Sequence, residues 1–85
     1  MPAKTLILPQ KVQKSANKLP RHIQKHLPKA LFSIKQNPLI GIRLHGELAG
    51  YYKYRIGDYR LVYRLNTKTS TVEVVKIEHR QGVYK

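Results

Sequence analysis

Four cations lie within the run Tyr51–Arg64, and their spacing suggests that they share one surface. Gly57-Asp58 separates two stretches of alternating side chains, which predicts a β-hairpin with a two-residue turn. Because such a turn fixes the register of its strands, Arg55 faces Arg60. One face then carries Lys53, Arg55, Arg60 and Arg64. The other carries three apolar pairs that we expect to face a core: Ile56 with Tyr59, Tyr54 with Leu61, and Tyr52 with Tyr63.

The opposition of Arg55 and Arg60 requires an explanation, because like charges that face each other destabilise a sheet by ~0.2–1 kcal/mol per pair. One explanation is a phosphate-type anion held between the two guanidinium groups, whose forked donors match phosphate oxygens. The other is that the long side chains splay into water over apolar neighbours such as Val62. The residues alone leave both explanations open.

A second group of polar side chains lies near the C-terminus. A strand over residues 71–80 alternates Val75, Ile77 and His79 with Val74, Lys76, Glu78 and Arg80. Apolar residues on both faces predict a central strand that is covered on both sides. Tyr84 follows Arg80 closely, and an aromatic ring beside arginines can stack on a nucleobase while they hold its phosphate. A lone tyrosine of this kind could equally be a packing residue.

Proton transfer has fewer candidates. His79 has the chemistry of a proton shuttle, but strand alternation points it away from Arg80 and allows a structural role instead. Glu47 and Asp58 fall in a loop and a turn, so no carboxylate is placed to act as a base. His22 and His26 are four residues apart without a third ligand, so we predict no metal site and no cofactor.

The elements that must position these residues follow from periodicity. We expect a strand within residues 3–8, two short helices over 9–19 and 21–37, mostly loop over 39–50, and strands at 51–56, 59–65 and 71–80. The second helix either bends at Pro28 or begins there, and we favour the bend. The order β-α-α-β-β-β predicts an α+β fold with a two-helix hairpin on one face of a small, mainly antiparallel sheet.

Charge points to the class of partner. The 85 residues form one domain, 1–85, with a net charge of +13 and a pI near 10.4. All four acids follow residue 46, and a pI above ~9 is typical of nucleic-acid binders. Surfaces that serve solubility alone mix both signs, which favours a polyanion or an acidic protein as partner. Without cysteines, a signal peptide or a membrane span, the chain is expected to be soluble and cytoplasmic.

The run Gly50–Tyr63, together with His79-Arg80 and Val83-Tyr84, resembles the signature of RelE-type toxins in the RelE/ParE superfamily. The resemblance covers essentially the whole chain. It implies a RelE-like fold and the toxin of a type II toxin-antitoxin system. The implied activity is that of an mRNA interferase, a ribosome-dependent endoribonuclease that cuts mRNA in the A site. The implied partners are the ribosome with bound mRNA and a cognate antitoxin, with which the toxin could form a hetero-oligomer.

The resemblance also implies roles for individual residues. Lys53 matches a basic residue that activates the ribose 2′-hydroxyl or holds the phosphate, and Arg55 matches a second one. Arg60 matches the arginine that stabilises the scissile phosphate, Arg80 the arginine near the leaving oxygen, and Tyr84 the tyrosine that stacks on a base. The implied reaction is attack by the 2′-hydroxyl without a metal. Arginine is always protonated, so Arg55 can bind charge but cannot act as a base.

Three further residues complete the expected site, since Tyr51, Arg64 and Lys76 are predicted to bind RNA beside the catalytic set. Two other functions remain as alternatives. A ParE-like toxin shares the fold but inhibits DNA gyrase through protein contacts, and a non-catalytic RNA-binding protein needs only the charge. A cleavage assay on translating ribosomes separates the three.

Overall fold

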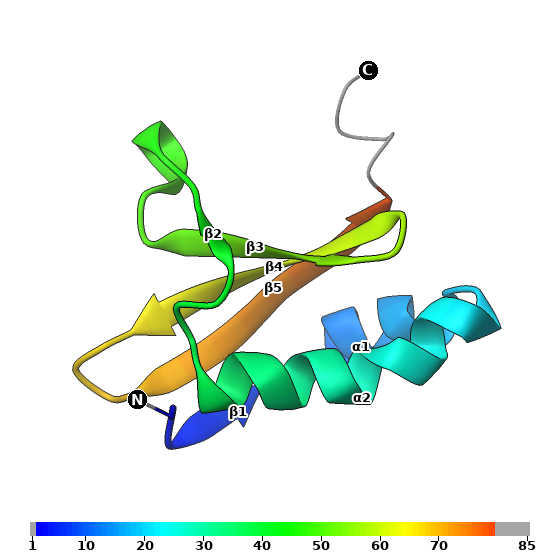
Figure 1. Ribbon diagram of the computed structural model, residues 1–85, viewed down its shortest axis with the longest axis horizontal. Coiled ribbons are helices and arrows are strands. Elements are labelled where there is room, and N and C mark those ends of the chain that lie inside the picture. The colour runs from blue at the N-terminus through cyan, green and yellow to red at the C-terminus, as the bar shows by residue number, and fades with distance from the viewer. Residues whose placement is uncertain (1, 80–85) are drawn as a thin grey trace.

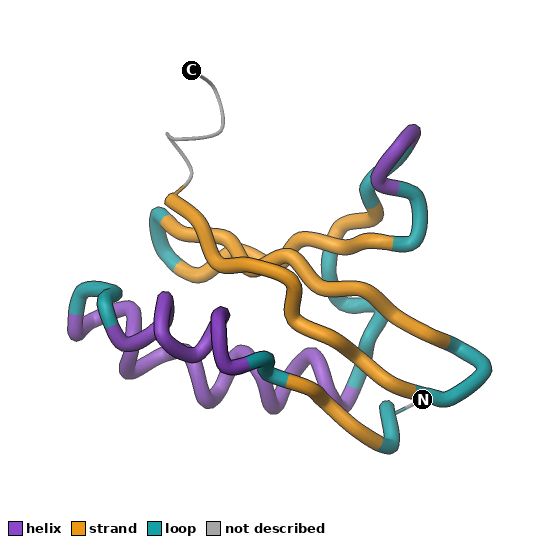
Figure 2. The backbone as a smooth tube through the Cα atoms, turned by 180° about the vertical axis from the view of Figure 1, so that it is seen from behind, coloured by secondary structure: helices purple, strands orange, loops and turns teal. Residues whose placement is uncertain are grey.

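The sheet and the two helices form two layers in the computed structural model, which describes residues 2–79 (Figure 1). The elements are β1 (Thr5–Ile7), α1 (Gln10–Asn17), α2 (Arg21–Gln36), β2 (Ile42–Arg43), a 3-10 turn (Gly46–Leu48), β3 (Tyr51–Ile56), β4 (Tyr59–Asn66) and β5 (Thr71–His79). The sheet order is β1-β5-β4-β3-β2, with β1 parallel to β5 and the other neighbours antiparallel. Both helices lie on one side of the sheet in both views (Figure 2). The predicted α+β fold is confirmed.

The helices pack through small apolar stripes at helical spacing. Their buried residues are Val12 and Ala16 in α1, and Ile23, Leu27, Ala30 and Ile34 in α2. A proline directly precedes each helix, and the φ values of Pro9 and Pro20, −58° and −55°, already suit a helix start. The helix α2 runs unbroken through the exposed Pro28, so the alternative in which it begins there is wrong.

The hairpin of β3 and β4 has the predicted register, including Arg55 opposite Arg60. Gly57 has a φ of +58° at the first central position of the turn, where a type II′ turn requires glycine. A Cβ atom there would also lie 3.0 Å from Cδ1 of Ile23. The two-residue turn therefore fixes which hairpin residues face the helices and which face away.

The prediction that β5 is covered on both faces is wrong, although the strand does lie inside the sheet between β1 and β4. A bulge interrupts its pairing with β4, where Val62 pairs with Lys76 but Tyr63 pairs with Val74. The extra residue, Val75, is 39% exposed. A bulge of one residue reverses the alternation, so Val74 and Ile77 both face the helices despite their odd spacing.

The segment that we expected to be mostly loop contains the strand β2, which pairs Ile42 with Lys53 at the edge of the sheet. The hydroxyl of Tyr63 holds this segment: it donates to the carbonyl of Pro38 at 2.6 Å and accepts from the N–H of Gly41 at 3.0 Å. A Cβ at Gly41 would lie 2.6 Å from that hydroxyl oxygen and 2.8 Å from the carbonyl of Lys53. A glycine is therefore required where this segment approaches the sheet.

The core lies between the helices and one face of the sheet, and Tyr63 is its largest fully buried side chain. Burial of its phenol raises the pKa of Tyr63, and the bond from Gly41 only partly offsets that rise. The opposite face of the sheet has no helix over it among residues 2–79 (Figure 2). Over the same residues, no helix combines the length and apolar character needed to cross a membrane.

Candidate active site

The sheet face that points away from the helices holds most of the residues predicted to do chemistry. Because alternate residues point to the same side, strand pairing arranges these side chains in rows across β3, β4 and β5. The rows are Arg55–Arg60–Glu78, Lys53–Val62–Lys76 and Tyr51–Arg64–Glu73. We call this surface the cationic face and define it by Lys53, Arg55, Arg60, Arg64 and Lys76.

The first row contains a carboxylate that sequence reasoning did not place at the site. Glu78 lies between two cations, with its Oε1 at 2.9 Å from Nζ of Lys76 and its Oε2 at 3.3 Å from a terminal nitrogen of Arg60. Its side chain is only 23% exposed. Sequence reasoning considered only Glu47 and Asp58 as carboxylates for the site, so Glu78 is the residue that it missed.

The electrostatics of this cluster keep Glu78 ionised. Burial raises the pKa of its carboxyl group, but the hydrogen bond and charge of Lys76, followed by those of Arg60, outweigh that effect and lower the pKa overall. Both carboxylate oxygens face cations, so the group acts here as an anion that neutralises charge. A carboxylate with a lowered pKa is also a weaker base.

Arg60 is only partly satisfied by this arrangement. Its side chain is 19% exposed, and its single ion pair within residues 2–79 is the 3.3 Å contact with Glu78. Its Nε is buried and has no hydrogen-bond partner within residues 2–79. A buried N–H without an acceptor costs about 1–3 kcal/mol, so the guanidinium retains an unused donor.

Arg55 faces Arg60 in register but has a different partner. Its Nε donates to the carbonyl of Gly57 at 3.0 Å. Arg55 also borders a hollow of about 390 Å³ between α2 and the hairpin, which His22 and His26 line as well. Arg55 and Arg60 therefore have separate partners, which relieves their opposition in the free protein.

The second row combines a buried valine with two lysines. Val62 is 3% exposed although it points away from the helix-side core. Its in-register neighbours are Lys53, which is half-buried, and Lys76, whose side chain is 57% exposed. Lysine stems commonly cover apolar surface while their amino groups remain in water, and the two lysines beside Val62 are placed to cover it in this way.

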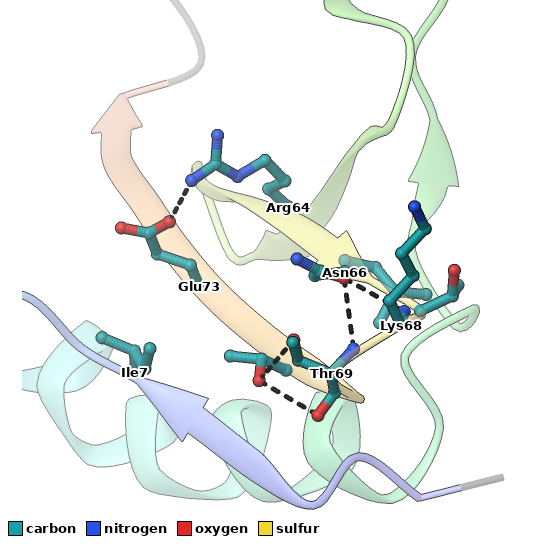
Figure 3. A pocket seen from close by; sticks show the side chains of 9 residues that line it. Ile7, Arg64, Asn66, Lys68, Thr69 and Glu73 are labelled. Carbon is teal, nitrogen blue, oxygen red and sulfur yellow. Dashed lines mark hydrogen bonds and ion pairs between the residues drawn. The ribbon is translucent and has the colours of Figure 1, made fainter.

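The third row ends at a hollow of about 670 Å³ (Figure 3). Arg64 forms an ion pair with Glu73, and its guanidinium carbon lies 5.9 Å from the centre of the Tyr51 ring. Figure 3 shows the ion pair at one side of the hollow and the β4–β5 turn at the other. Oδ1 of Asn66 orders that turn by accepting from the backbone N–H groups of Lys68 and Thr69, at 3.0 and 3.2 Å.

Of the remaining predicted residues, His79 lies on the other face of the sheet. His79 pairs with Tyr59, and the two rings meet edge to face with centroids 4.9 Å apart. Strand alternation therefore places His79 on the side of β5 opposite Glu78, as expected from the sequence. Arg80 and Tyr84 lie outside the described residues. No group of three or more potential metal ligands occurs within residues 2–79.

The family of the chain follows from comparison with known proteins. A family model described as the ParE toxin of the type II toxin-antitoxin system parDE matches residues 6–84. The chain belongs to this family. Toxin RelG of Mycobacterium tuberculosis is 33% identical over 75 residues, which cover 86% of each chain. The RelE-type resemblance of the sequence, within the RelE/ParE superfamily, is thereby confirmed.

Solved structures agree with this assignment. The toxin-antitoxin complex RelBE2 of M. tuberculosis matches with a TM-score of 0.81 and 32% identity, over 94% of this chain and 100% of the other. The isolated E. coli RelE toxin matches with a TM-score of 0.76 and 27% identity, over 94% and 89%. This type II toxin therefore has the fold of the RelE structures.

Proposed function

We propose that this toxin is an endoribonuclease that cleaves mRNA in the ribosomal A site. The observation that carries the proposal is the cationic face, where Arg60 and Lys76 surround one anionic group on a sheet surface that no helix of residues 2–79 covers. A phosphodiester presents the same kind of acceptor oxygens as the carboxylate of Glu78. The similarity to RelE-type toxins over almost the whole chain supports the same function.

The proposed reaction breaks the bond between phosphorus and the 5′ oxygen of the next nucleotide. The 2′-hydroxyl attacks its own 3′-phosphate, which leaves a 2′,3′-cyclic phosphate and a free 5′-hydroxyl. Arg60 stabilises the charge on the crowded phosphorane, and Lys53 orients the 2′-hydroxyl or holds the phosphate. Arg55 supplies charge alone. Arg80 assists the leaving oxygen, and Tyr84 stacks on a base of the substrate.

RNA would extend along the cationic face. Neighbouring rows are two residues apart along the strands, or about 6.8 Å, which is close to the length of one extended nucleotide. Lys76 in the second row and Arg64 and Tyr51 in the third can therefore contact successive phosphates and a base. The hollow beside Arg64 leaves room for the strand to continue.

The proposed restraint on this activity is an acidic antitoxin, with which the toxin forms a hetero-oligomer. A net charge of +13 attracts such a partner, and the RelBE2 structure from M. tuberculosis is a toxin-antitoxin complex. The antitoxin could cover the cationic face or wrap the helices. The helices expose a separate set of basic side chains: Lys11, Lys14, Lys18, Arg21, Lys25 and Lys29.

Cleavage of mRNA on translating ribosomes tests the proposal. We expect wild-type toxin to give fragments with 5′-hydroxyl ends, and Arg60→Ala and Arg80→Ala each to lose roughly 10²–10³ in rate, as when one charge-stabilising donor is removed. Lys35→Ala is the matched control, because it removes one positive charge from an exposed position at the end of α2. Its rate should remain within about threefold of wild type, which corresponds to ~0.7 kcal/mol.

Three outcomes would contradict the proposal. If Arg60→Ala retains wild-type cleavage, the role of Arg60 is wrong. If wild-type toxin leaves ribosome-bound mRNA intact but inhibits DNA supercoiling by gyrase, the ParE-like alternative is correct. If it binds RNA and does neither, it is a non-catalytic binding protein.

A further inference from the structure

We infer that Glu78 occupies the phosphate site of this toxin in its free state, so that RNA enters only by displacing the carboxylate. The inference rests on the proposed function for the identity of the ligand as an RNA phosphate. Glu78 is then an internal competitor of the RNA phosphate for the cations that bind it.

The position of Glu78 is that of a bound anion. Each of its oxygens faces a different cation, Lys76 at 2.9 Å and Arg60 at 3.3 Å, in the manner expected of two phosphate oxygens. The strand pairing that places Glu78 opposite Arg60 also holds Lys76 on the same side of β5. A diester phosphate with two non-bridging oxygens could replace the carboxylate while keeping both contacts.

Arg60 shows that the carboxylate is an imperfect occupant. The contact between Arg60 and Glu78 is a single one, whereas a guanidinium can donate two parallel bonds to a phosphate. The buried Nε of Arg60 has no acceptor within residues 2–79, so a small movement of its side chain toward a better ligand would satisfy a donor that is now unused. A bound phosphate would accept a hydrogen bond from this Nε. The side chain of Glu78, which is partly exposed, can rotate toward the solvent to make room for it.

The competition has a consequence for where the toxin acts. Free RNA must displace an anion that is already attached to the protein and therefore has a high effective concentration. A ribosome already holds its mRNA in position, so this RNA competes with the carboxylate far better than free RNA does. Glu78 thus weakens binding to RNA away from the ribosome while partly neutralising Arg60 and Lys76.

The test measures binding of the full-length toxin to a single-stranded RNA with 2′-O-methyl groups, which blocks the attacking hydroxyl and prevents cleavage. At fixed salt we expect Glu78→Gln to bind about fivefold to tenfold more tightly than wild type. Glu47→Gln, in the exposed 3-10 turn, makes the same change in net charge away from the cationic face. It should remain within about twofold of wild type.

A second variant separates displacement from net charge. Glu78→Asp keeps the negative charge but shortens the side chain by one methylene, so it cannot reach both cations as well. Tighter binding by this variant would support displacement even if Glu78→Gln did not fold, and thermal unfolding checks both proteins. Equal affinities for wild type, Glu78→Asp and Glu78→Gln, or an equal gain from Glu47→Gln, would overturn the inference.

The outcomes also distinguish this inference from the proposed function. If wild-type toxin cleaves ribosomal mRNA but the Glu78 variants bind RNA as it does, the function stands and the displacement is wrong. If the Glu78 variants bind more tightly but wild type cleaves nothing on ribosomes, the anion site stands and the nuclease proposal is wrong.

Discussion

The pair formed by Glu78 and Arg60 shows how one in-register contact changes the chemistry of a surface. From the sequence, Arg60 faces only another arginine, and its removal would relieve repulsion. In the structure, Arg60 also has an ion pair and an unsatisfied buried Nε. We expect the loss of the pair and the removal of the orphaned donor to offset each other, so Arg60→Ala should change the free energy of unfolding by no more than about 1 kcal/mol.

Chemical denaturation of Arg60→Ala and wild type at neutral pH measures this change in the free energy of unfolding. A much larger loss of stability would mean that Arg60 is chiefly a structural residue, and reduced cleavage by the variant could then reflect unfolding. Catalytic loss with intact stability is the combination that supports a role in the reaction.

Glu78 makes the stability of the toxin depend on acid pH. Its pKa is lowered in the folded state from an ordinary value of 4.5, because Lys76 and Arg60 outweigh the effect of burial. Its stabilising contribution is therefore fully present above pH 4.5 and is lost as the pH falls through the lowered folded value. Thermal unfolding from pH 7 to pH 2 should show wild type losing more stability in acid than Glu78→Gln. Parallel curves for the two proteins would contradict this assignment.

At the scale of elements, the turn length decides what could be predicted. The two-residue turn at Gly57 fixed the register of β3 and β4, and every predicted pair is present. The turn between β4 and β5 is longer, and the bulge at Val75 shifts the pairing once more. Alternation alone put Lys76 and Glu78 on one side of β5, but it could not place them opposite a particular residue of β4. That missing register is the reason why Glu78 was overlooked.

The strand β2 could not be predicted for a different reason. Two residues are too few to show a periodicity, and the strand is held by a distant side chain rather than by its own composition. The hydroxyl of Tyr63 makes the decisive bonds, to Pro38 and Gly41. Alternation predicts that Tyr63 faces the core, but it does not say which backbone groups its hydroxyl meets.

This dependence makes Tyr63 the residue to test. Tyr63→Phe removes a buried hydroxyl and leaves the N–H of Gly41 and the carbonyl of Pro38 without that partner. We expect a loss of about 1–3 kcal/mol in the free energy of unfolding, measured by urea denaturation. Tyr54→Phe is the matched control, because its hydroxyl makes no hydrogen bond within residues 2–79 and it should cost little. Equal losses in the two variants would show that the hydroxyl of Tyr63 does not hold β2.

At the scale of the whole molecule, charge is divided between two surfaces. The helices expose one set of lysines and arginines, and the sheet carries the cationic face on the other side. The two acids that moderate the cationic face are Glu73 and Glu78, which come from β5. No acid lies in α1 or α2, so the helical surface has no ion pair of its own to screen it.

This division should make the association with the proposed acidic antitoxin depend on salt. Steering by a net charge of +13 should make association fast at low ionic strength and slower as the Debye length falls from ~10 Å at 0.1 M to ~3 Å at 1 M. Stopped-flow mixing of the toxin with its cognate antitoxin, over a salt series, measures the effect. Replacing Lys11, Lys14 and Lys18 by glutamine should reduce the salt dependence if the antitoxin wraps the helices. Replacing Lys53 and Lys76 by glutamine should reduce the salt dependence if the antitoxin covers the cationic face. An association rate that does not change with salt would exclude electrostatic steering on either surface.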